Sequence, residues 1–214
     1  MTTKVRIDYV SDVACPWCAI GLLGLEKALE RTRDVVDATI TFQPFELNPG
    51  MPAEGQNVDQ HLSEKYGMSQ QQLAANREPL RQRAAALGFA FNQSERSRMY
   101  NTFDAHRLLH WAKTQGRQLE LKLALFKANF SDDANVADSE ALASIAESVG
   151  LDGAQAREVL QSDRYAQDVR DAERLWQARG IQGVPAIVLN EKYLISGGQP
   201  AEVFEQALRQ VAAQ

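Results

Sequence analysis

Two cysteines, separated by one proline and one tryptophan, are the residues of this sequence whose types and spacing could do chemistry. Cys15 and Cys18 are the only cysteines among the 214 residues. Two thiols three positions apart can form and break one disulfide, and such a pair directly after a strand is typical of redox proteins. The pair therefore indicates thiol or redox chemistry.

The elements that must position these thiols can be predicted from their neighbours. Apolar and charged side chains alternate over residues 4–9, which predicts a half-buried strand. Pro16 suits the first position of a helix, so we expect Cys15 at the helix mouth and Cys18 about one turn inside. Unpaired backbone amides and the positive end of the helix dipole stabilise a thiolate at Cys15. Cys15 is the predicted nucleophile and the deeper, less exposed Cys18 the predicted resolving thiol.

Two simpler roles for the pair are weaker. A tetrahedral zinc site would need two more ligands, and the three histidines, His61, His106 and His110, are remote in sequence. No metal site is therefore expected. A disulfide that closes so small a loop constrains the unfolded chain little, so a purely structural bridge is also disfavoured.

Composition limits the partners and the compartment. The net charge of -5, with no run of basic residues, argues against nucleic acid or an anionic membrane as the main partner. No apolar stretch approaches the roughly 20 residues that a membrane span requires. The first strand is predicted to begin by about Lys4, which leaves no room for a signal peptide, so a cytoplasmic protein is expected.

Both ends of the chain are predicted to be mixed α/β. A helix with leucines and an isoleucine over residues 20–29 and a strand over 39–45 follow the cysteines, and a right-handed crossover would make the two strands parallel neighbours. Near the other end the pattern predicts a hairpin of strands 186–189 and 193–196 and a final helix over 200–211.

The middle of the chain is predicted to be helical. Glycines at five helix-end positions suit left-handed caps, Ser69 with Gln72 forms a capping box, and Asp138 and Asp163 are candidate N-caps. We therefore expect an α/β domain formed by residues 1–57 and 181–214, with an inserted helical domain over 58–180.

This order of elements resembles the thioredoxin superfamily, and in particular its DsbA branch, in which a helical domain interrupts the thioredoxin fold. The closest resemblance is to DsbA-like oxidoreductases of the FrnE type. The motifs that carry it span nearly the whole chain: Ser11-Asp12-Val13-Ala14-Cys15-Pro16-Trp17-Cys18, Pro44-Phe45-Glu46-Leu47-Asn48-Pro49, Asn101-Thr102-Phe103-Asp104-Ala105-His106-Arg107, Gly183-Val184-Pro185 and Ser196-Gly197-Gly198-Gln199-Pro200.

The resemblance implies further site residues. In relatives the proline that matches Pro185 has a cis peptide bond and faces the cysteines, so the Val184 backbone is expected to pair with an extended substrate. An aromatic residue often follows the second cysteine in relatives, and Ala19 departs from that pattern beside Trp17. The residues expected to line a substrate groove are Pro16, Trp17, Asn48, Asn101, His106, Val184 and Gln199.

The expected function is thiol–disulfide exchange with thiol or disulfide substrates, either protein or small molecule. No tightly bound cofactor is needed beyond the Cys15–Cys18 disulfide, and glutathione is a candidate co-substrate. A reducing cytosol favours a reductant or isomerase.

Two alternatives stay open. One is a glutathione-dependent isomerase or transferase, since 2-hydroxychromene-2-carboxylate isomerases and kappa-class glutathione transferases resemble the same inserted fold. Those families commonly have serine at the position of Cys15, and Asn48, Val184 and Gln199 would then contact glutathione. The other is a thiol-bearing binding or chaperone module without turnover.

Overall fold

The computed structural model of the chain describes residues 2–52 and 54–214. These residues form two compact units. The first runs to Leu47 and resumes at Ala166, and the second is the continuous segment Asn48–Tyr165. The expected architecture of an α/β unit interrupted in sequence by a helical one is therefore confirmed.

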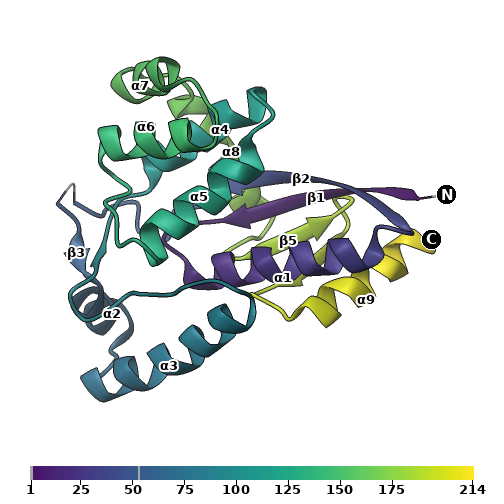
Figure 1. The fold of residues 1–214 in the computed structure, drawn as a ribbon, viewed down its shortest axis with the longest axis horizontal. Helices are drawn as coiled ribbons and strands as arrows, with labels where there is room; N and C mark the ends of the chain where they lie inside the picture. Colours follow the sequence, from purple (N-terminus) through teal and green to yellow (C-terminus); the bar gives the residue numbers. More distant parts are fainter. Residues whose placement is uncertain (1, 53) are drawn as a thin grey trace. The chain divides into compact units, whose positions relative to one another are not determined.

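The first unit is built on a four-stranded sheet of order β2-β1-β5-β6. Strand β1 pairs with β2 in parallel and with β5 in antiparallel register, and β6 completes the sheet as an antiparallel edge strand. The elements of this unit are β1 (Thr3–Ser11), α1 (Pro16–Thr32), β2 (Val36–Pro44), α8 (Ala166–Ala178), β5 (Ala186–Leu189), β6 (Tyr193–Ser196) and α9 (Ala201–Ala212). The predicted strand–helix–strand half and the hairpin–helix half are both present, as Figure 1 shows.

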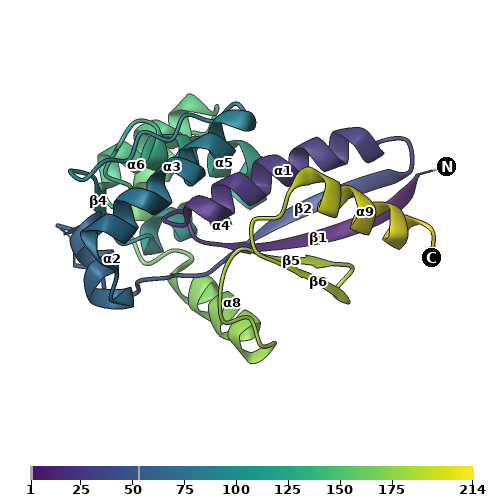
Figure 2. The same cartoon turned by 90° about the horizontal axis from the view of Figure 1, so that it is seen from below.

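Helices cover both faces of this sheet. Figure 2 shows α1 and α9 together on one face, with α8 on the other. The side of α9 that faces the sheet carries Phe204 and Leu208, both fully buried, while Val203 remains exposed. Because β1 lies inside the sheet under these helices, its apolar side chains are buried and the strand end that leads to the cysteines is fixed.

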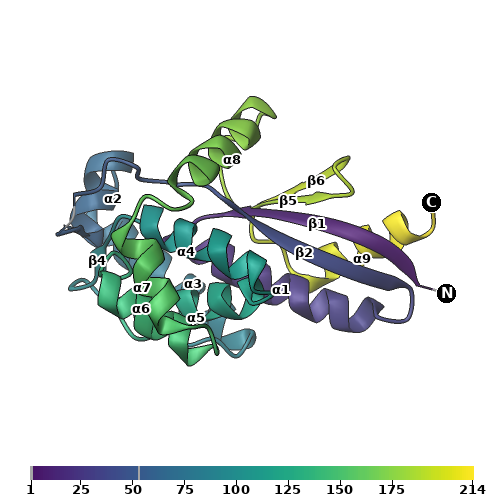
Figure 3. The same cartoon turned by 90° about the horizontal axis from the view of Figure 1, so that it is seen from above.

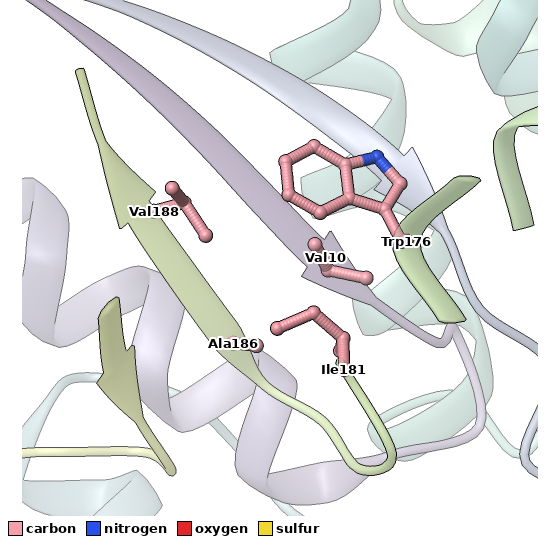
Figure 4. Close-up of a cluster of buried hydrophobic side chains, with 5 residues drawn as sticks. All are labelled: Val10, Trp176, Ile181, Ala186 and Val188. Atoms are coloured by element: carbon pink, nitrogen blue, oxygen red, sulfur yellow. The ribbon is translucent and has the colours of Figure 1, made fainter. Parts of the chain in front are cut away.

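Helix α8 belongs to the first unit, whereas the sequence analysis assigned residues 58–180 to the helical insertion. Its Trp176 is buried in a cluster with Val10 of β1, Ile181, and Ala186 and Val188 of β5, which Figure 4 shows. Helical periodicity identifies an apolar face but not the core against which it packs. The boundaries therefore fall at Leu47 and Ala166 rather than at 57 and 181.

The second unit is mainly helical, with one short two-stranded ladder between β3 and β4 that the sequence analysis did not predict. Helices α6 and α7 lie side by side in it, as Figures 1 and 3 show. Its elements are β3 (Gln56–Asn57), α2 (Val58–Tyr66), α3 (Gln70–Ala86), β4 (Arg98–Met99), α4 (Phe103–Thr114), α5 (Gln118–Phe130), α6 (Ser139–Ser148) and α7 (Gly153–Gln161).

Helix ends in the middle of the chain follow the predicted signals in most places. Ser69 and Gln72 form the expected capping box, and Asp138 caps α6 through the amide of Ala141. The five glycines expected at helix ends all adopt positive φ: Gly67, Gly88, Gly116, Gly150 and Gly180. The N-cap predicted at Asp163 is wrong, because α8 begins only at Ala166.

No helix among the described residues is long and apolar enough to cross a lipid bilayer.

Candidate active site

Cys15 occupies the N-cap of α1, directly ahead of Pro16 at the first helical position. Its backbone is extended, with φ of -98° and ψ of 111°, and its carbonyl oxygen accepts the amide hydrogen of Cys18 at 3.0 Å. Proline suits this position because it needs no amide partner in the first turn. The chain leaves β1 and turns into α1 with the sulfur of Cys15 at the positive end of the helix, as predicted.

The two thiols differ in depth. Cys18 is fully buried, Cys15 is 4% exposed, and Trp17 between them is 40% exposed. Both cysteines are thiols in the structure. Cys15 is therefore the less buried of the two thiols, beside the exposed Trp17.

The loop before β5 faces Cys15. The Sγ atom of Cys15 lies 3.8 Å from the carbonyl oxygen of Val184, within range of a weak S–H···O hydrogen bond. The peptide bond between Val184 and Pro185 is cis, the isomer that the sequence analysis expects. The carbonyl oxygen of Pro185 accepts the amide hydrogen of Gly197 at 2.8 Å, so this loop is tied to the end of the hairpin.

A tyrosine and two glycines that sequence reasoning did not single out pack beneath the cysteines. The hydroxyl of Tyr9 donates to the carbonyl oxygen of Cys18 at 2.8 Å. A Cβ atom on Gly21 would lie 2.8 Å from this hydroxyl, and one on Gly198 would lie 2.6 Å from the carbonyl oxygen of Trp17. The close approach of three chain segments, which the sequence marks only by the glycines at 21 and 198, thus fixes the first turn of α1.

Burial raises the pKa of Tyr9 well above its usual value near 10, and the neighbouring Cys18 and Cys15 add to the rise. The phenol therefore stays neutral across the physiological range and keeps its proton as a hydrogen-bond donor. It anchors the backbone at Cys18.

The predicted groove residues divide between the two units. The first unit holds Pro16, Trp17, Val184 and Gln199, and the side-chain amide of Gln199 donates to the carbonyl oxygen of Ser196 at 2.8 Å. The second unit holds the other three, Asn48, Asn101 and His106.

Asn48 and Asn101 have structural partners within the second unit. The Oδ1 atom of Asn48 accepts from Lys65 Nζ at 2.6 Å and lies 2.9 Å from Nε2 of His61. Asn101 accepts the amide hydrogen of Phe103 at the start of α4, at 2.9 Å. His106 is buried on α4. Their roles in a groove remain predictions.

Among the residues that the structure describes, no group of three or more histidine, cysteine, aspartate or glutamate side chains is arranged to hold a metal ion.

A paired thiol at a helix N-terminus, on a sheet of this order interrupted by a helical segment, defines a class of protein. The family model for the DSBA-like thioredoxin domain matches residues 6–209. The chain belongs to this family, whose members include thiol–disulfide oxidoreductases.

Individual relatives agree with the family. The chain is 30% identical over 205 residues to the uncharacterized protein YwbO of Bacillus subtilis (strain 168), covering 95% of this chain and 96% of that one. The crystal structure of the probable DsbA oxidoreductase SCO1869 from Streptomyces coelicolor is 42% identical, with a TM-score of 0.91 over 98% of this chain and 91% of that chain.

A more distant structure shares the fold alone. The cytosolic disulfide reductase DsbM from Pseudomonas aeruginosa, solved with GSH, is 15% identical, with a TM-score of 0.66 over 98% of this chain and 100% of that chain.

Proposed function

We propose that the chain exchanges disulfides through Cys15 and Cys18, with Cys15 as the attacking thiol and Cys18 as the resolving thiol. The observation that carries the proposal is the unequal placement of the two sulfurs. Cys15 lies at the mouth of α1 against the Val184 carbonyl, while Cys18 is fully buried one turn inside. An outer thiolate at a helix N-terminus and a shielded second thiol are what sequential exchange needs.

In the reducing direction the Cys15 thiolate attacks one sulfur of a substrate disulfide, and the other sulfur leaves as a thiolate. The Cys18 thiolate then attacks Sγ of Cys15 in the mixed disulfide and releases the second substrate sulfur. Two electrons pass to the substrate, its two sulfurs take up two protons, and the enzyme ends as the Cys15–Cys18 disulfide. Oxidation of a substrate dithiol is the same sequence reversed.

We further propose a cytoplasmic reductant or isomerase of the FrnE type that uses no tightly bound cofactor and takes glutathione as a co-substrate. A reducing compartment would keep the pair as a dithiol, ready to attack. The fold relative DsbM was solved with GSH, which motivates glutathione as the first thiol to test. In this proposal Trp17 and the Val184 backbone contact the substrate.

The first test is the equilibrium of the purified protein across ratios of reduced to oxidised glutathione, with mass spectrometry to separate an internal disulfide from a glutathione adduct. A reversible loss of two hydrogens that links Cys15 to Cys18 supports the proposal. Saturable, noncovalent glutathione binding without that bond would instead favour the isomerase or transferase alternative.

Single variants test the assigned roles. Cys15→Ser should abolish exchange, whereas Cys18→Ser should accumulate mixed disulfides on Cys15 that a nonreducing gel and mass spectrometry detect. Equal and full activity in both variants would overturn the assignment, and unchanged partner binding by the double serine variant would favour the chaperone alternative.

A further inference from the structure

Asp12 is a buried carboxylate beside the cysteine loop to which the exchange steps assign no role. It follows β1 and is 1% exposed. Its Oδ1 atom accepts the amide hydrogen of Ala14 at 3.2 Å, and its Oδ2 atom accepts that of Leu47 at 2.7 Å. Its main-chain oxygen also accepts the amide hydrogen of Cys15 at 3.2 Å. One residue thus holds both the segment before Cys15 and the segment after β2.

We propose that Asp12 is a positioning residue that clamps the loop before Cys15 and makes the Cys15–Cys18 pair a stronger reductant. This inference rests on the proposed function, because it concerns the redox potential of the same pair.

Asp12 accepts the amide hydrogens of the two residues just before Pro16. Backbone N–H groups around a helix N-terminus are the donors that stabilise a thiolate. Asp12 takes the N–H of Ala14 and the N–H of Cys15, and Pro16 has none. The amides that precede the helix are therefore turned to Asp12 rather than to the sulfur.

Asp12 also acts through its charge. A carboxylate that accepts two backbone amides makes charge-assisted hydrogen bonds and is held in one orientation. The negative charge of Asp12 is therefore held beside Ala14 and Cys15. Because Asp12 is buried, solvent screens this charge only weakly. A fixed negative charge disfavours a nearby thiolate. Because a less stable reduced form donates electrons more readily, both effects lower the potential of the pair.

Leu47 is the last residue of the first unit, and Asn48 begins the second. The Oδ2 contact therefore holds the last residue of the first unit, while Oδ1 holds the loop that carries the nucleophile. If Asp12 only satisfied the backbone amides of one loop, its two oxygens would not need to accept hydrogen bonds from two separate segments of the chain.

The test is the redox midpoint of Asp12→Asn against glutathione. The amide is neutral and keeps only one acceptor oxygen, so we expect the equilibrium to shift three- to tenfold toward the dithiol; a tenfold shift is about 30 mV more oxidising. The matched control is Asp8→Asn. Asp8 is a fully buried aspartate within β1, but it accepts from the side chains of Gln43 at 2.7 Å and Arg6 at 3.3 Å and not from the cysteine loop. Its substitution should move the midpoint less than twofold.

A folded Asp12→Asn variant with an unchanged midpoint overturns the proposal, even if its melting temperature falls, because a purely structural role would lower stability alone. If that variant does not fold, hydrogen exchange of the unmodified protein decides. Slow exchange of the Ala14 and Leu47 amides, which lie outside regular hydrogen-bonded elements, supports the clamp, and exchange at the rate of an open loop overturns it. If the unmodified protein forms no Cys15–Cys18 disulfide, the proposed function fails, whereas hydrogen exchange still tests the clamp.

Discussion

Helices α1 and α4 begin in different ways. At the start of α4, Asn101 accepts the amide hydrogen of Phe103, Asp104 lies in the first turn, and Arg107 donates to Asp104 at 2.8 Å. Neither N-cap residue, Thr102 in α4 or Cys15 in α1, makes a side-chain capping bond, but the first turn of α1 also carries no acidic residue. Side chains thus neutralise the positive end of α4, whereas α1 leaves that end to a sulfur.

The difference shows that α1 lacks side-chain capping at the end where its reactive thiol lies. Capping an N-terminus with a side chain stabilises a helix by about 1 kcal/mol. The cysteine helix forgoes this contribution and is held instead by contacts further along, among them the Tyr9 hydroxyl on the Cys18 carbonyl. An uncapped helix end is typical of an anion site, and here the anion would be the Cys15 thiolate.

Among the variants that test this contrast, we expect Gly198→Ala to lower the exchange rate most. The new Cβ atom would lie 2.6 Å from the Trp17 carbonyl oxygen, so the first turn of α1 must shift. Overpacking of this kind costs about 1–3 kcal/mol, and we expect the exchange rate to fall about tenfold with a lower melting temperature.

Gly183→Ala is the matched control for this change. It lies in the loop before Val184, and apart from its own chain neighbours no atom of the described residues lies within 4 Å of a Cβ built there. Its exchange rate should stay within twofold of the unmodified protein. Equal rates for both alanine variants would show that the position of the first turn of α1 does not limit exchange.

The sequence predicted the elements of this site better than the contacts beneath it. Pro16, the cysteine spacing and the alternation in β1 are local signals, so the strand, the helix and the unequal thiols could be predicted from them. The packing of Tyr9 against Cys18, and of Gly198 against Trp17, joins residues that are distant in the chain or on different elements. No periodicity records such contacts, which also explains why α8 was assigned to the wrong unit.

A second prediction concerns charge balance in the two units. Asp104 and Arg107 of α4 pair directly, but Glu46 and Glu173 in the first unit both contact Arg170. Burial, and then the negative charge of Glu173, raises the pKa of Glu46 from 4.5 to about 7. The folded chain therefore keeps a proton that the unfolded chain releases near pH 4.5, and the free energy of unfolding should fall by about 1–3 kcal/mol as pH rises through this window.

Glu46→Gln should remove most of that dependence, which urea unfolding at pH 5, 6, 7 and 8 can measure. Glu202→Gln is the control, because Glu202 is an exposed partner of Arg31, and its change should leave the slope nearly intact. A slope that stays unchanged in Glu46→Gln would assign the pH dependence to other groups.

We expect the smallest effect from Asn101→Ala, and this variant can also contradict the contrast between α1 and α4. The variant loses the acceptor for the Phe103 amide at the start of α4, so stability should fall by about 1 kcal/mol. Asn101→Asp keeps the acceptor oxygen and should restore stability, since a negative charge is favourable at a helix N-terminus. If Asn101 acts only by accepting the Phe103 amide hydrogen, both variants exchange disulfides within twofold of the unmodified protein. A fivefold or larger loss of exchange in a fully folded alanine variant would instead place Asn101 in the substrate groove, as its motif suggested. The start of α4 would then take part in chemistry, as the start of α1 does, and the contrast between the two helices would fail.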